Sequence, residues 1–495
     1  MISVFFSTPI TSKENLEYLK DSCILPDVEV IQFVNQKTHS LAEAYNKGLE
    51  ESKYPIVVFV HDDVLLEKGW DKKVYDHFQN SDYGILGVAG TTELDNTGMW
   101  WRKPQNMVGR VFHQSKEGKW YRSEYSHLIP NHIHQTVTVD GVFIAVHKER
   151  IKQSFDTEFK GFHFYDIPFC LKNHLESVKI GVISDFKLRH KSIGVIGEEW
   201  NKFREQFVKL YGEHLPATVA PIPFVSKITP KLSQSPKVTI IIPTKDNFEV
   251  LKNCLDSFEK SNYQNFDIII ADTGSNEETL ASIEKLTSDR IKLVKYDYYH
   301  FAKINNDVVK NHVDSNTELL LFCNDDIQLI NDAISLMVEV YLKNKKTVGT
   351  IGCRLHFENN SVQHGGVLCY MNKENRMGFS HKGIRTFYGA SFDTEEDILG
   401  NTGAFLMIRK ALFQGIGGFD ERPKECFEDV ILNIDCILRN YKNIYVGAAA
   451  CYHYESVTRK KNPKKAQMES SDANEFLAPK VSKHAARLKK YILNL

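Results

Sequence analysis

The sequence predicts two α/β domains in tandem, and its length, its alternation of elements and an internal repeat support that fold class. The chain has 495 residues, more than one ordinary domain holds. Hydrophobic residues make up 42% and charged residues 25%, a balance typical of globular proteins. Apolar β-branched runs alternate with helical stretches in both halves, and polar landmarks of the first half recur 263 residues later.

The predicted strands are short apolar runs of the kind that parallel sheets bury. Helical periodicity separates them, for example over 248–260 and 276–287. This alternation predicts a sheet with right-handed crossovers in each half. The predicted strands are 2–6, 28–33 and 56–60 in the first half, and 238–242, 266–270 and 319–322 in the second.

A proline-rich stretch divides the two halves. Residues 216–236 contain five of the 15 prolines and show no helical or strand period, which is typical of an extended connector. We therefore expect a first domain at 1–215, a linker at 216–236, a second domain at 237–458 and a separate tail at 459–495.

Charge and cysteine content narrow the function classes. Lys+Arg (62) and Asp+Glu (63) nearly cancel, which argues against nucleic-acid binding. The nine cysteines form no CxxC pair, so we expect a reducing compartment without a structural zinc site. No apolar run approaches the length of a membrane span, and residues 1–6 lack the basic region of a signal peptide, so the sequence predicts a cytoplasmic protein.

The repeat consists of polar landmarks at matched spacing. Paired acids follow a strand at Asp62/Asp63 and again at Asp325/Asp326. The second acid of each pair lies 103 residues before Asp166 or Asp429, and a histidine follows 24 residues later, at His190 or His453. Shorter matches support the repeat, at 41–46 against 301–306 and at 140–143 against 402–405. Because a core constraint would repeat apolar positions, this pattern predicts a duplicated site.

The chemistry of these landmarks has functional and structural interpretations. Paired carboxylates at the carboxyl end of a parallel strand could hold Mg²⁺ or Mn²⁺ and, through the ion, a diphosphate, or they could form an acidic turn. Asp166 and Asp429 could each be a general base or an N-cap of the helices predicted at 167–175 and 430–440. His190 and His453 could complete a metal site or be structural.

The second half, 237–458, resembles the family 2 glycosyltransferases of the GT-A fold, which are inverting enzymes that use nucleotide-sugar donors. Its motifs are 242–247 at the opening strand, 271–275 at the second strand, 324–326 as the DXD-type motif, and 427–429 with the base. Segments 362–366, 400–404 and 417–421 resemble the rhamnosyltransferase-like branch, and 453–456 resembles the closing strand. The first half, through 59–64, 139–141 and 161–166, is similar to a more divergent branch.

This resemblance implies site roles in both halves. Asp429 and Asp166 would be the catalytic bases. The implied metal–diphosphate groups are Asp325, Asp326, His453, Asp62, Asp63 and His190. The implied donor-binding residues are Pro243, Thr244, Asp272, Asn306, Thr8 and Asn46. Two residues beyond each base many members carry another acid, whereas this chain has Pro168 and Ile431, so their sugar specificity does not transfer.

The implied reaction is an inverting sugar transfer with Mn²⁺ or Mg²⁺ and a UDP-, dTDP- or GDP-linked donor. Two sites in one chain suggest a polymerase that makes one linkage per domain. It would build a capsule or O-antigen type polysaccharide on a glycan acceptor, which could be lipid-linked, at the inner face of the cytoplasmic membrane. The alternative is that only the second domain is catalytic and the first binds glycan or acts as a scaffold. A wholly non-catalytic protein and a nucleotidyltransferase are the rival classes, and the latter normally has a glycine- and lysine/arginine-rich loop after the first strand that Thr244–Asn247 does not provide.

The C-terminal tail has a different composition. Residues 456–495 contain ten Lys/Arg against three acids. The run 459–465 predicts a basic loop near the site, and 480–495 predicts a basic amphipathic helix. Such a helix could lie on an anionic membrane or pack on the second domain.

Overall fold

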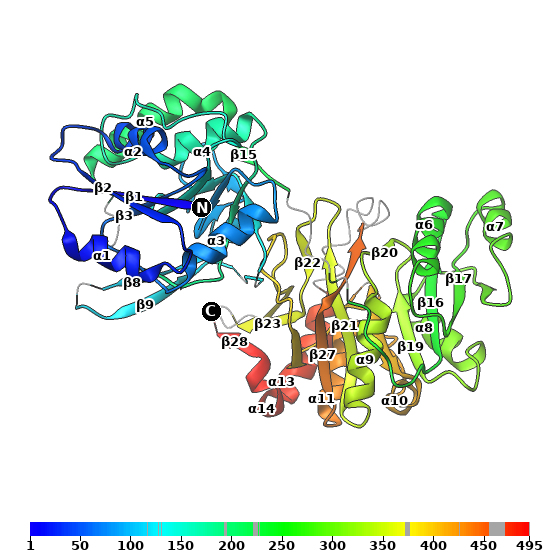
Figure 1. Ribbon diagram of the computed structural model, residues 1–495. Helices are drawn as coiled ribbons and strands as arrows, with labels where there is room; N and C mark the ends of the chain where they lie inside the picture. Colours follow the sequence, from blue (N-terminus) through cyan, green and yellow to red (C-terminus); the bar gives the residue numbers. More distant parts are fainter. Residues whose placement is uncertain are drawn as a thin grey trace. The chain divides into compact units, whose positions relative to one another are not determined.

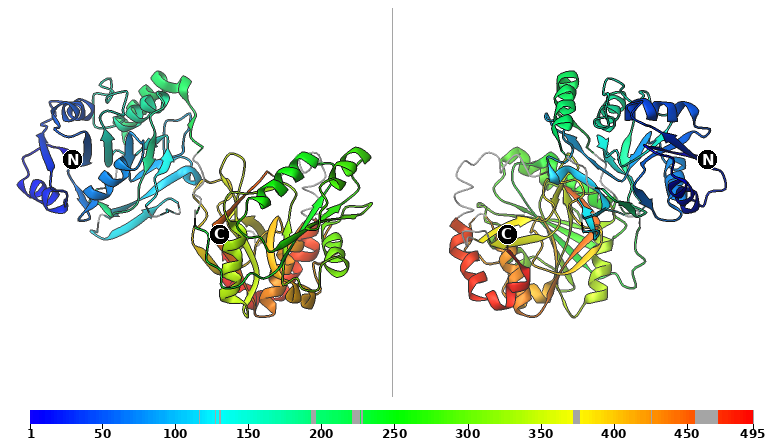
Figure 2. Two further views of the ribbon diagram at one scale, coloured as in Figure 1. Left: turned by 45° about the vertical axis from the view of Figure 1, so that its right-hand side comes forward. Right: turned by 90° about the vertical axis from the view of Figure 1, so that its left-hand side faces the viewer.

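In the computed structural model the chain divides into two compact units, 1–221 and 222–495. The structure describes residues 1–115, 117–126, 128–129, 131–192, 196–220, 226, 228–371, 377–424, 426–454 and 471–494. Figures 1 and 2 show that each unit has its own sheet and covering helices. The basic run 459–465 and part of the proline-rich linker lie outside the described residues.

The main sheet of the first unit has seven strands in the order β10-β13-β5-β12-β3-β1-β2. The β1–β2 and β1–β3 pairs are parallel, as predicted, but β12 runs antiparallel to both β3 and β5. Its strands are β1 (Ile2–Thr8), β2 (Val28–Val34), β3 (Ile56–His61), β5 (Ile85–Gly87), β10 (His134–Thr136), β12 (Phe143–His147) and β13 (Ile180–Val182). Its helices are α1 (Lys13–Ser22), α2 (Leu41–Glu51), α3 (Trp70–Gln79), α4 (Asp166–Leu175) and α5 (Glu198–Tyr211).

Apolar side chains explain how the helices cover this sheet. On one face, Tyr45 of α2 stacks on Phe59 of β3 with ring centroids 4.5 Å apart, and Phe169 of α4 stacks on Phe155 at 4.0 Å. On the other face, Trp70 of α3 packs against Phe143 of β12. Because successive strand residues point to opposite faces, the apolar runs supply both layers of the core.

Two smaller sheets complete the first unit. One has the order β11-β6-β8-β14-β4, with β9 paired to β8, and it carries the histidine of the repeat at the end of β14. The other pairs β15 with β7, so the unit continues past residue 215. Their strands are β4 (Val64–Leu66), β6 (Ala89–Thr91), β7 (Glu93–Leu94), β8 (Met107–Gln114), β9 (Trp120–Glu124), β11 (Thr138–Val139), β14 (Leu188–His190) and β15 (Ala217–Thr218).

The main sheet of the second unit follows the order β18-β17-β16-β19-β26-β21-β27-β20. Six consecutive strands, β17-β16-β19-β26-β21-β27, match β2-β1-β3-β12-β5-β13 of the first unit, including the antiparallel strand, here β26. The strands are β16 (Val238–Thr244), β17 (Phe266–Asp272), β18 (Ile291–Lys295), β19 (Leu319–Cys323), β20 (Ile327–Leu329), β21 (Val348–His356), β22 (Val362–His364), β25 (Thr394–Ile398), β26 (Phe405–Arg409) and β27 (Lys442–His453). The repeat of the sequence is therefore a repeat of topology.

Helices cover both faces of this second sheet (Figures 1 and 2). One face packs against α6 (Phe248–Glu259) and α9 (Ala333–Asn344). The other packs against α8 (Phe301–Asn311), α10 (Lys410–Ile416) and α11 (Glu428–Leu438). A further helix, α7 (Glu277–Glu284), follows β17.

The predicted single helix over 480–495 is wrong. The described part of the tail forms α13 (Ala478–Lys483), α14 (Ala485–Leu488) and β28 (Ile492–Asn494), and β28 pairs with β23 (Val367–Met371), itself paired with β24 (Met377–His381). Val481 and Leu488 are buried in a cluster with Ile431 and Ile434 of α11. The apolar side of the tail therefore packs on the second unit, because α11 leaves an apolar face for it. Among the described residues, no helix has the length and apolar character needed to cross a membrane.

Candidate functional site

The acid and histidine of the repeat meet in both units with the same geometry. His190 Nε2 lies 3.2 Å from Asp63 Oδ1, and His453 Nε2 lies 3.2 Å from Asp326 Oδ1. Both acids follow the central strand, β3 or β19, and both histidines end a strand that returns beside that turn. The matched spacing in the sequence therefore reflects a matched pair of side chains.

Backbone hydrogen bonds explain how this contact is held. The amide of Lys191 donates to the carbonyl of Asp63 at 3.2 Å, and the amide of Tyr454 donates to the carbonyl of Asp326 at 3.2 Å. The residue after each histidine is thus hydrogen-bonded to the turn that carries the acid. This arrangement positions the imidazole over the carboxylate in both units.

The two predicted bases also have matched partners. Asp166 Oδ2 accepts from the amide of Gly141 at 2.9 Å, and Asp429 Oδ2 accepts from the amide of Gly403 at 2.7 Å. The other oxygen accepts from the next amide of its helix, Ile167 at 2.9 Å or Val430 at 2.6 Å. Two N–H donors therefore orient each carboxylate and favour its charged form.

The N-cap interpretation of these acids is wrong. Asp166 is the first residue of α4, and Asp429 is the second residue of α11, whose caps are Tyr165 and Phe427. The aspartates reach across to the glycine-containing strand connection instead. Burial raises the pKa of Asp166 to about 7, and the neighbouring carboxylate of Asp140 adds to the shift.

The adjacent acids Asp325 and Asp326 have different surroundings. Asp325 Oδ2 accepts from the hydroxyl of Thr244 at 2.8 Å and from the side-chain Nδ2 of Asn247 at 3.3 Å. Asp325 therefore faces the opening strand, whereas Asp326 faces His453. Burial raises the pKa of Asp325 to about 6, although the hydrogen bond from Thr244 acts in the opposite direction by stabilising the charged carboxylate.

The first unit repeats this turn with other partners. The backbone carbonyl of Asp62 accepts from the Asn15 side chain at 2.8 Å. Burial opposes ionisation of Asp63, but its hydrogen bond with His190 holds the pKa of Asp63 below the usual range.

The predicted nucleotide-binding residues differ between the units. Asp272 ends β17 beside Thr244, and its Oδ2 accepts from the amides of Gly274 and Ser275, both at 3.2 Å. Its Oδ1 is buried without a hydrogen-bond partner among the described residues, which leaves an acceptor for a ligand. Pro243 lies one position earlier in the same strand pair.

In the first unit, Thr8 occupies the position of Thr244. The strand register places Val34 beside Thr8, where the second unit has Asp272 beside Thr244. The first unit therefore lacks the carboxylate at this position, so this edge of its sheet has different chemistry.

Asn46 and Asn306, which the resemblance implies as donor-binding residues, each bond to the backbone of a loop. Asn46 Nδ2 donates to the carbonyl of Phe155 and its Oδ1 accepts from the amide of Phe155, both at 2.9 Å. Asn306 makes the same two bonds to Phe419, also at 2.9 Å. Because both amide groups are occupied by backbone, these asparagines fix a loop to α2 or α8.

Two residues of the first unit were missed as site residues in the sequence. His61 Nδ1 lies 3.4 Å from His190 Nε2, and its Nε2 lies 2.7 Å from the hydroxyl of Tyr165. Burial and the imidazole of His190 lower the pKa of His61, so the ring is neutral at pH 7. The repeat carried the signal, because His61 occupies the place of Asn324 in the second unit.

Two further residues of the second unit were also missed. Gln363 Oε1 faces His453 Nδ1, and Gln363 Nε2 donates to the carbonyl of His453 at 3.3 Å. His364 Nδ1 lies 2.7 Å from His381 Nδ1, and its Nε2 accepts from the amide of Thr402 at 3.4 Å, next to Gly403. Both residues belong to the segment 362–366, whose resemblance to known transferases was the available signal.

The donor sets suit a divalent cation in both units. When His453 Nδ1–H donates to Gln363, Nε2 presents a lone pair toward Asp326 at 3.2 Å. Two facing acceptors are stabilised by a cation between them, and carboxylate with imidazole suits Mn²⁺ and its neighbours. In the first unit, one ligand atom each of His61, Asp63 and His190 lie within 4.8 Å of one another.

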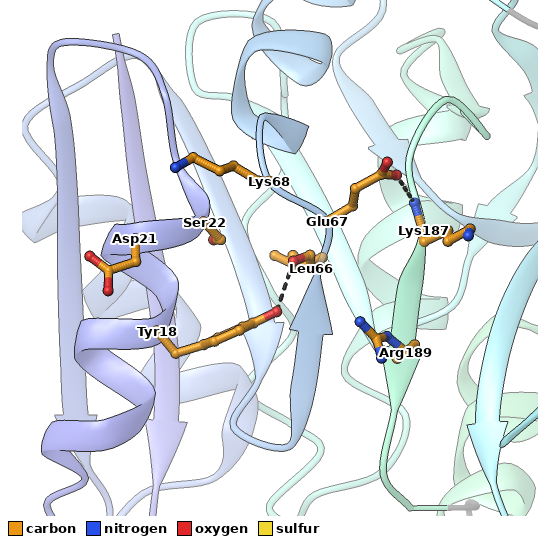
Figure 3. Close-up of a pocket in the computed structure, with 8 residues that line it drawn as sticks. All are labelled: Tyr18, Asp21, Ser22, Leu66, Glu67, Lys68, Lys187 and Arg189. Atoms are coloured by element: carbon orange, nitrogen blue, oxygen red, sulfur yellow. Dashed lines mark hydrogen bonds between the residues drawn. The ribbon is translucent and has the colours of Figure 1, made fainter. Parts of the chain in front are cut away.

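A cavity of about 440 Å³ in the first unit lies apart from these side chains (Figure 3). Arg189, which lines it, is exposed, whereas His190 is buried, because successive strand residues point to opposite faces. Tyr18 closes one wall by donating to the carbonyl of Leu66 at 2.8 Å. The lining residues are Tyr18, Asp21, Ser22, Leu66, Glu67, Lys68, Lys187 and Arg189. None of the predicted site residues lines this cavity.

The fold and the duplicated site together define a class: tandem α/β transferases with polar groups at the carboxyl edge of each sheet. Residues 8–211 match the family model described as "Glycosyltransferase like family", and residues 239–417 match "Glycosyl transferase family 2". The two matches together cover well over half of the chain. The second half of the chain therefore belongs to the family 2 glycosyltransferases and the first half to a glycosyltransferase-like family, so the chain has two glycosyltransferase domains in tandem.

Individual relatives agree with this assignment. "O-antigen biosynthesis protein RfbC" of Myxococcus xanthus is 28% identical over 270 residues, 51% of this chain and 20% of that protein. "O-antigen chain rhamnosyltransferase RfbN" of Salmonella typhimurium is 23% identical over 227 residues, 45% of this chain and 68% of that protein. A solved "Mannosyltransferase PcManGT from Pyrobaculum calidifontis in complex with GDP-Man and Mn2+" aligns at 14% identity with a TM-score of 0.34, over 55% of this chain and 78% of that one, which is too distant to support an argument. The chain spans less than a third of the length of the first relatives it matches.

Proposed function

We propose that both units transfer sugars from nucleotide-sugar donors with inversion, so that the chain adds two linkages in building a bacterial surface polysaccharide of O-antigen or capsule type. The observation that carries the proposal is the duplicated base, Asp166 on the amide of Gly141 and Asp429 on the amide of Gly403. In both units the carboxylate stands at the same place in the repeated fold, with one backbone N–H donor on each oxygen.

The chemistry follows from the contacts of the base. Each oxygen of Asp429 accepts one backbone N–H and retains a second lone pair for a substrate hydroxyl. The carboxylate would accept the hydroxyl proton as the new C–O bond forms at the anomeric carbon, and the bond to the diphosphate breaks on the opposite face. In the first unit, a pKa of about 7 places Asp166 in the range where a general base works best.

The remaining side chains bind the donor. Asp326 with His453, and Asp63 with His190, would hold Mn²⁺ or Mg²⁺, which supplies charge stabilisation to the departing diphosphate. Asp325 would assist through its bond to Thr244, and Asp62 is its counterpart. The unpartnered oxygen of Asp272 would accept from the nucleobase of a UDP-, dTDP- or GDP-linked donor.

The setting of the reaction follows from the relatives. The names of two relatives refer to O-antigen, which supports a lipid-linked glycan acceptor and a cytoplasmic protein that works at the inner face of the membrane. Because the apolar side of the tail is buried, peripheral membrane contact would use exposed lysines such as Lys483 and Lys489.

The experiment measures nucleoside diphosphate released from UDP-, GDP- and dTDP-sugars with Mn²⁺ or Mg²⁺ and a mixed glycan acceptor pool. Asp166→Asn and Asp429→Asn are compared with matched controls at exposed acids, Asp82→Asn and Asp256→Asn. We expect each base variant to lose turnover of a different donor and the controls to behave as wild type. If neither base variant lost turnover, the proposal would be wrong.

A second candidate is that only the second unit is catalytic and the first binds glycan or acts as a scaffold. Val34 in place of the acid of the second unit favours it, because the nucleobase then lacks a carboxylate partner. In that case only Asp429→Asn loses turnover, and the wild-type and Asp166→Asn proteins bind the acceptor glycan equally.

A further inference from the structure

The turn after β3 differs from its counterpart after β19 in one side chain. The first unit has His61 where the second has Asn324, and both lie beside the histidine that faces the acid. Asn324 Nδ2 lies 3.1 Å from His453 Nε2, and because an amide nitrogen offers hydrogens but no available lone pair, it cannot bind a cation there. His61 instead presents a second ring nitrogen, at 3.4 Å from His190 Nε2.

Three polar groups compete for one hydrogen bond with His190 Nε2. Asp63 Oδ1 lies 3.2 Å away, Ser192 Oγ 3.1 Å and His61 Nδ1 3.4 Å. An imidazole nitrogen either donates one proton or accepts one, so it makes one good in-plane hydrogen bond. A cation coordinated by the carboxylate and both imidazoles would satisfy all three donor atoms at once.

The spacing of the donor atoms suits such an ion. Two ligands about 2.0–2.1 Å from one ion at a tetrahedral angle lie about 3.3–3.4 Å apart. The separation of 3.2 Å for His190 and Asp63, and of 3.4 Å for His190 and His61, match that value within a few tenths. Little rearrangement would therefore be needed to bind the ion.

The contact behind His61 fixes its ring. The hydroxyl of Tyr165 lies 2.7 Å from His61 Nε2, and Tyr165 itself is buried. When Nε2–H donates to that hydroxyl, the lone pair of Nδ1 faces His190 and Asp63. Gly141 makes room for this contact, because a Cβ there would lie 2.1 Å from the Tyr165 hydroxyl oxygen.

We propose that His61, Asp63 and His190 form a metal centre that binds a divalent transition metal without a nucleotide and prefers it over Mg²⁺. Two imidazoles and one carboxylate favour borderline ions such as Co²⁺ and Zn²⁺, whereas Mg²⁺ prefers oxygen ligands. The second unit has one imidazole and one carboxylate at the same place and depends on the diphosphate for further ligands. The inference deepens the proposed function and rests on it for the identity of the pocket.

The test is titration of the chelator-treated full chain with Co²⁺ in the absence of nucleotide, followed by visible absorption and calorimetry. We expect one equivalent of Co²⁺ in wild type, displaced by Zn²⁺ and retained in millimolar Mg²⁺. His61→Asn, which copies the second unit, should weaken binding by at least about tenfold. The matched control His214→Asn removes a half-exposed imidazole of the same unit and should bind as wild type.

The reciprocal variant tests the same chemistry in the second unit. Asn324→His should add a second equivalent of Co²⁺ beside Asp326 and His453, and it decides the question if His61→Asn fails to fold. The inference would be overturned if wild type bound no Co²⁺, or if folded His61→Asn bound Co²⁺ with wild-type affinity. If His61→Asn does not fold, the inference would be overturned by an Asn324→His variant that binds no second equivalent of Co²⁺. Nucleoside diphosphate release, measured in the same preparations, separates the metal-centre inference from the proposed sugar transfer. If the protein releases nucleoside diphosphate but binds no Co²⁺ in the absence of nucleotide, only the metal-centre inference is rejected. If it binds Co²⁺ but releases no nucleoside diphosphate, only the proposed transfer is rejected.

Discussion

Replacing Asn433 by alanine should loosen the second unit and displace Asp429, its proposed catalytic base. Asn433 is fully buried on α11, one turn after Asp429. Its amide donates to the carbonyl of Asn401 at 2.8 Å, and its Oδ1 accepts from the amide of Asn401 at 3.1 Å and from the hydroxyl of Thr350. These bonds join α11 to the loop whose Gly403 amide orients the base.

The expected magnitude follows from those three tertiary hydrogen bonds. A buried neutral hydrogen bond contributes about 1 kcal/mol net, so Asn433→Ala should lower the free energy of unfolding of the second unit by about 3 kcal/mol. Turnover that depends on Asp429 should fall by about 10²-fold, because small displacements of a base cost rate steeply. Asn311→Ala, at an exposed helical position of the same unit, should change stability by less than about 0.5 kcal/mol.

The assay uses the distribution of tryptophan. All five tryptophans lie at or before residue 200, so their fluorescence reports unfolding of the first unit, whereas far-ultraviolet circular dichroism reports both. In urea, the Asn433→Ala variant should keep the fluorescence transition of wild type. Only the part of the dichroism transition that comes from the second unit should shift to lower urea concentration. A shift no larger than that of Asn311→Ala would refute the reasoning.

Three further outcomes follow from the contacts of the two units. Asp429→Asn should lower kcat by about 10²–10⁴-fold with little change in the donor KM, measured with the donor used by the second unit, and an unchanged kcat would contradict its assignment as the base. Gln363→Leu removes the partner that sets the His453 tautomer, so the Mn²⁺ concentration for half-maximal turnover should rise about 10–100-fold. An unchanged Mn²⁺ titration would exclude this positioning role of Gln363. A hydrogen bond from Lys160 and the helix-capping bonds lower the pKa of Glu43 to about 2. The contribution of Glu43 to the free energy of unfolding is therefore complete above the ordinary pKa of about 4.5 and is lost as the pH falls toward 2. The contribution should be about 1 kcal/mol because the side chain is solvent-accessible, and Glu43→Gln should reduce the fluorescence-detected loss of stability between pH 6 and pH 3.

Much of the fold could be predicted because it depends on local pattern. The apolar runs at 238–242 and 319–322 form buried strands, and helical periodicity predicted α6. The antiparallel strand β26 was not predicted, because strand direction depends on where the chain returns to the sheet and not on the residues of the strand. The tail was predicted as one helix because its period is helical, but packing of Leu488 and pairing of β28 with β23 divide it.

The sequence by itself predicted that this protein carries the same polar landmarks twice. Equal spacing of Asp63, His190 and their counterparts Asp326 and His453 is visible without coordinates, because insertion or loss of residues between functional landmarks would have broken it. The residue types at those positions also limited the chemistry to carboxylates and imidazoles, since those are the groups that bind cations and accept protons at neutral pH.

Only the tertiary structure decided which neighbours each polar group has. Adjacent acids in one turn point in different directions, so Asp325 joins Thr244 while Asp326 joins His453, and no local pattern distinguishes them. The occupied amide of Asn46 and the approach of His61 to His190 depend on partners more than a hundred residues away. Burial, hydrogen bonding and the pKa of a side chain all come from those distant partners, and for that reason the roles of individual residues required the folded chain.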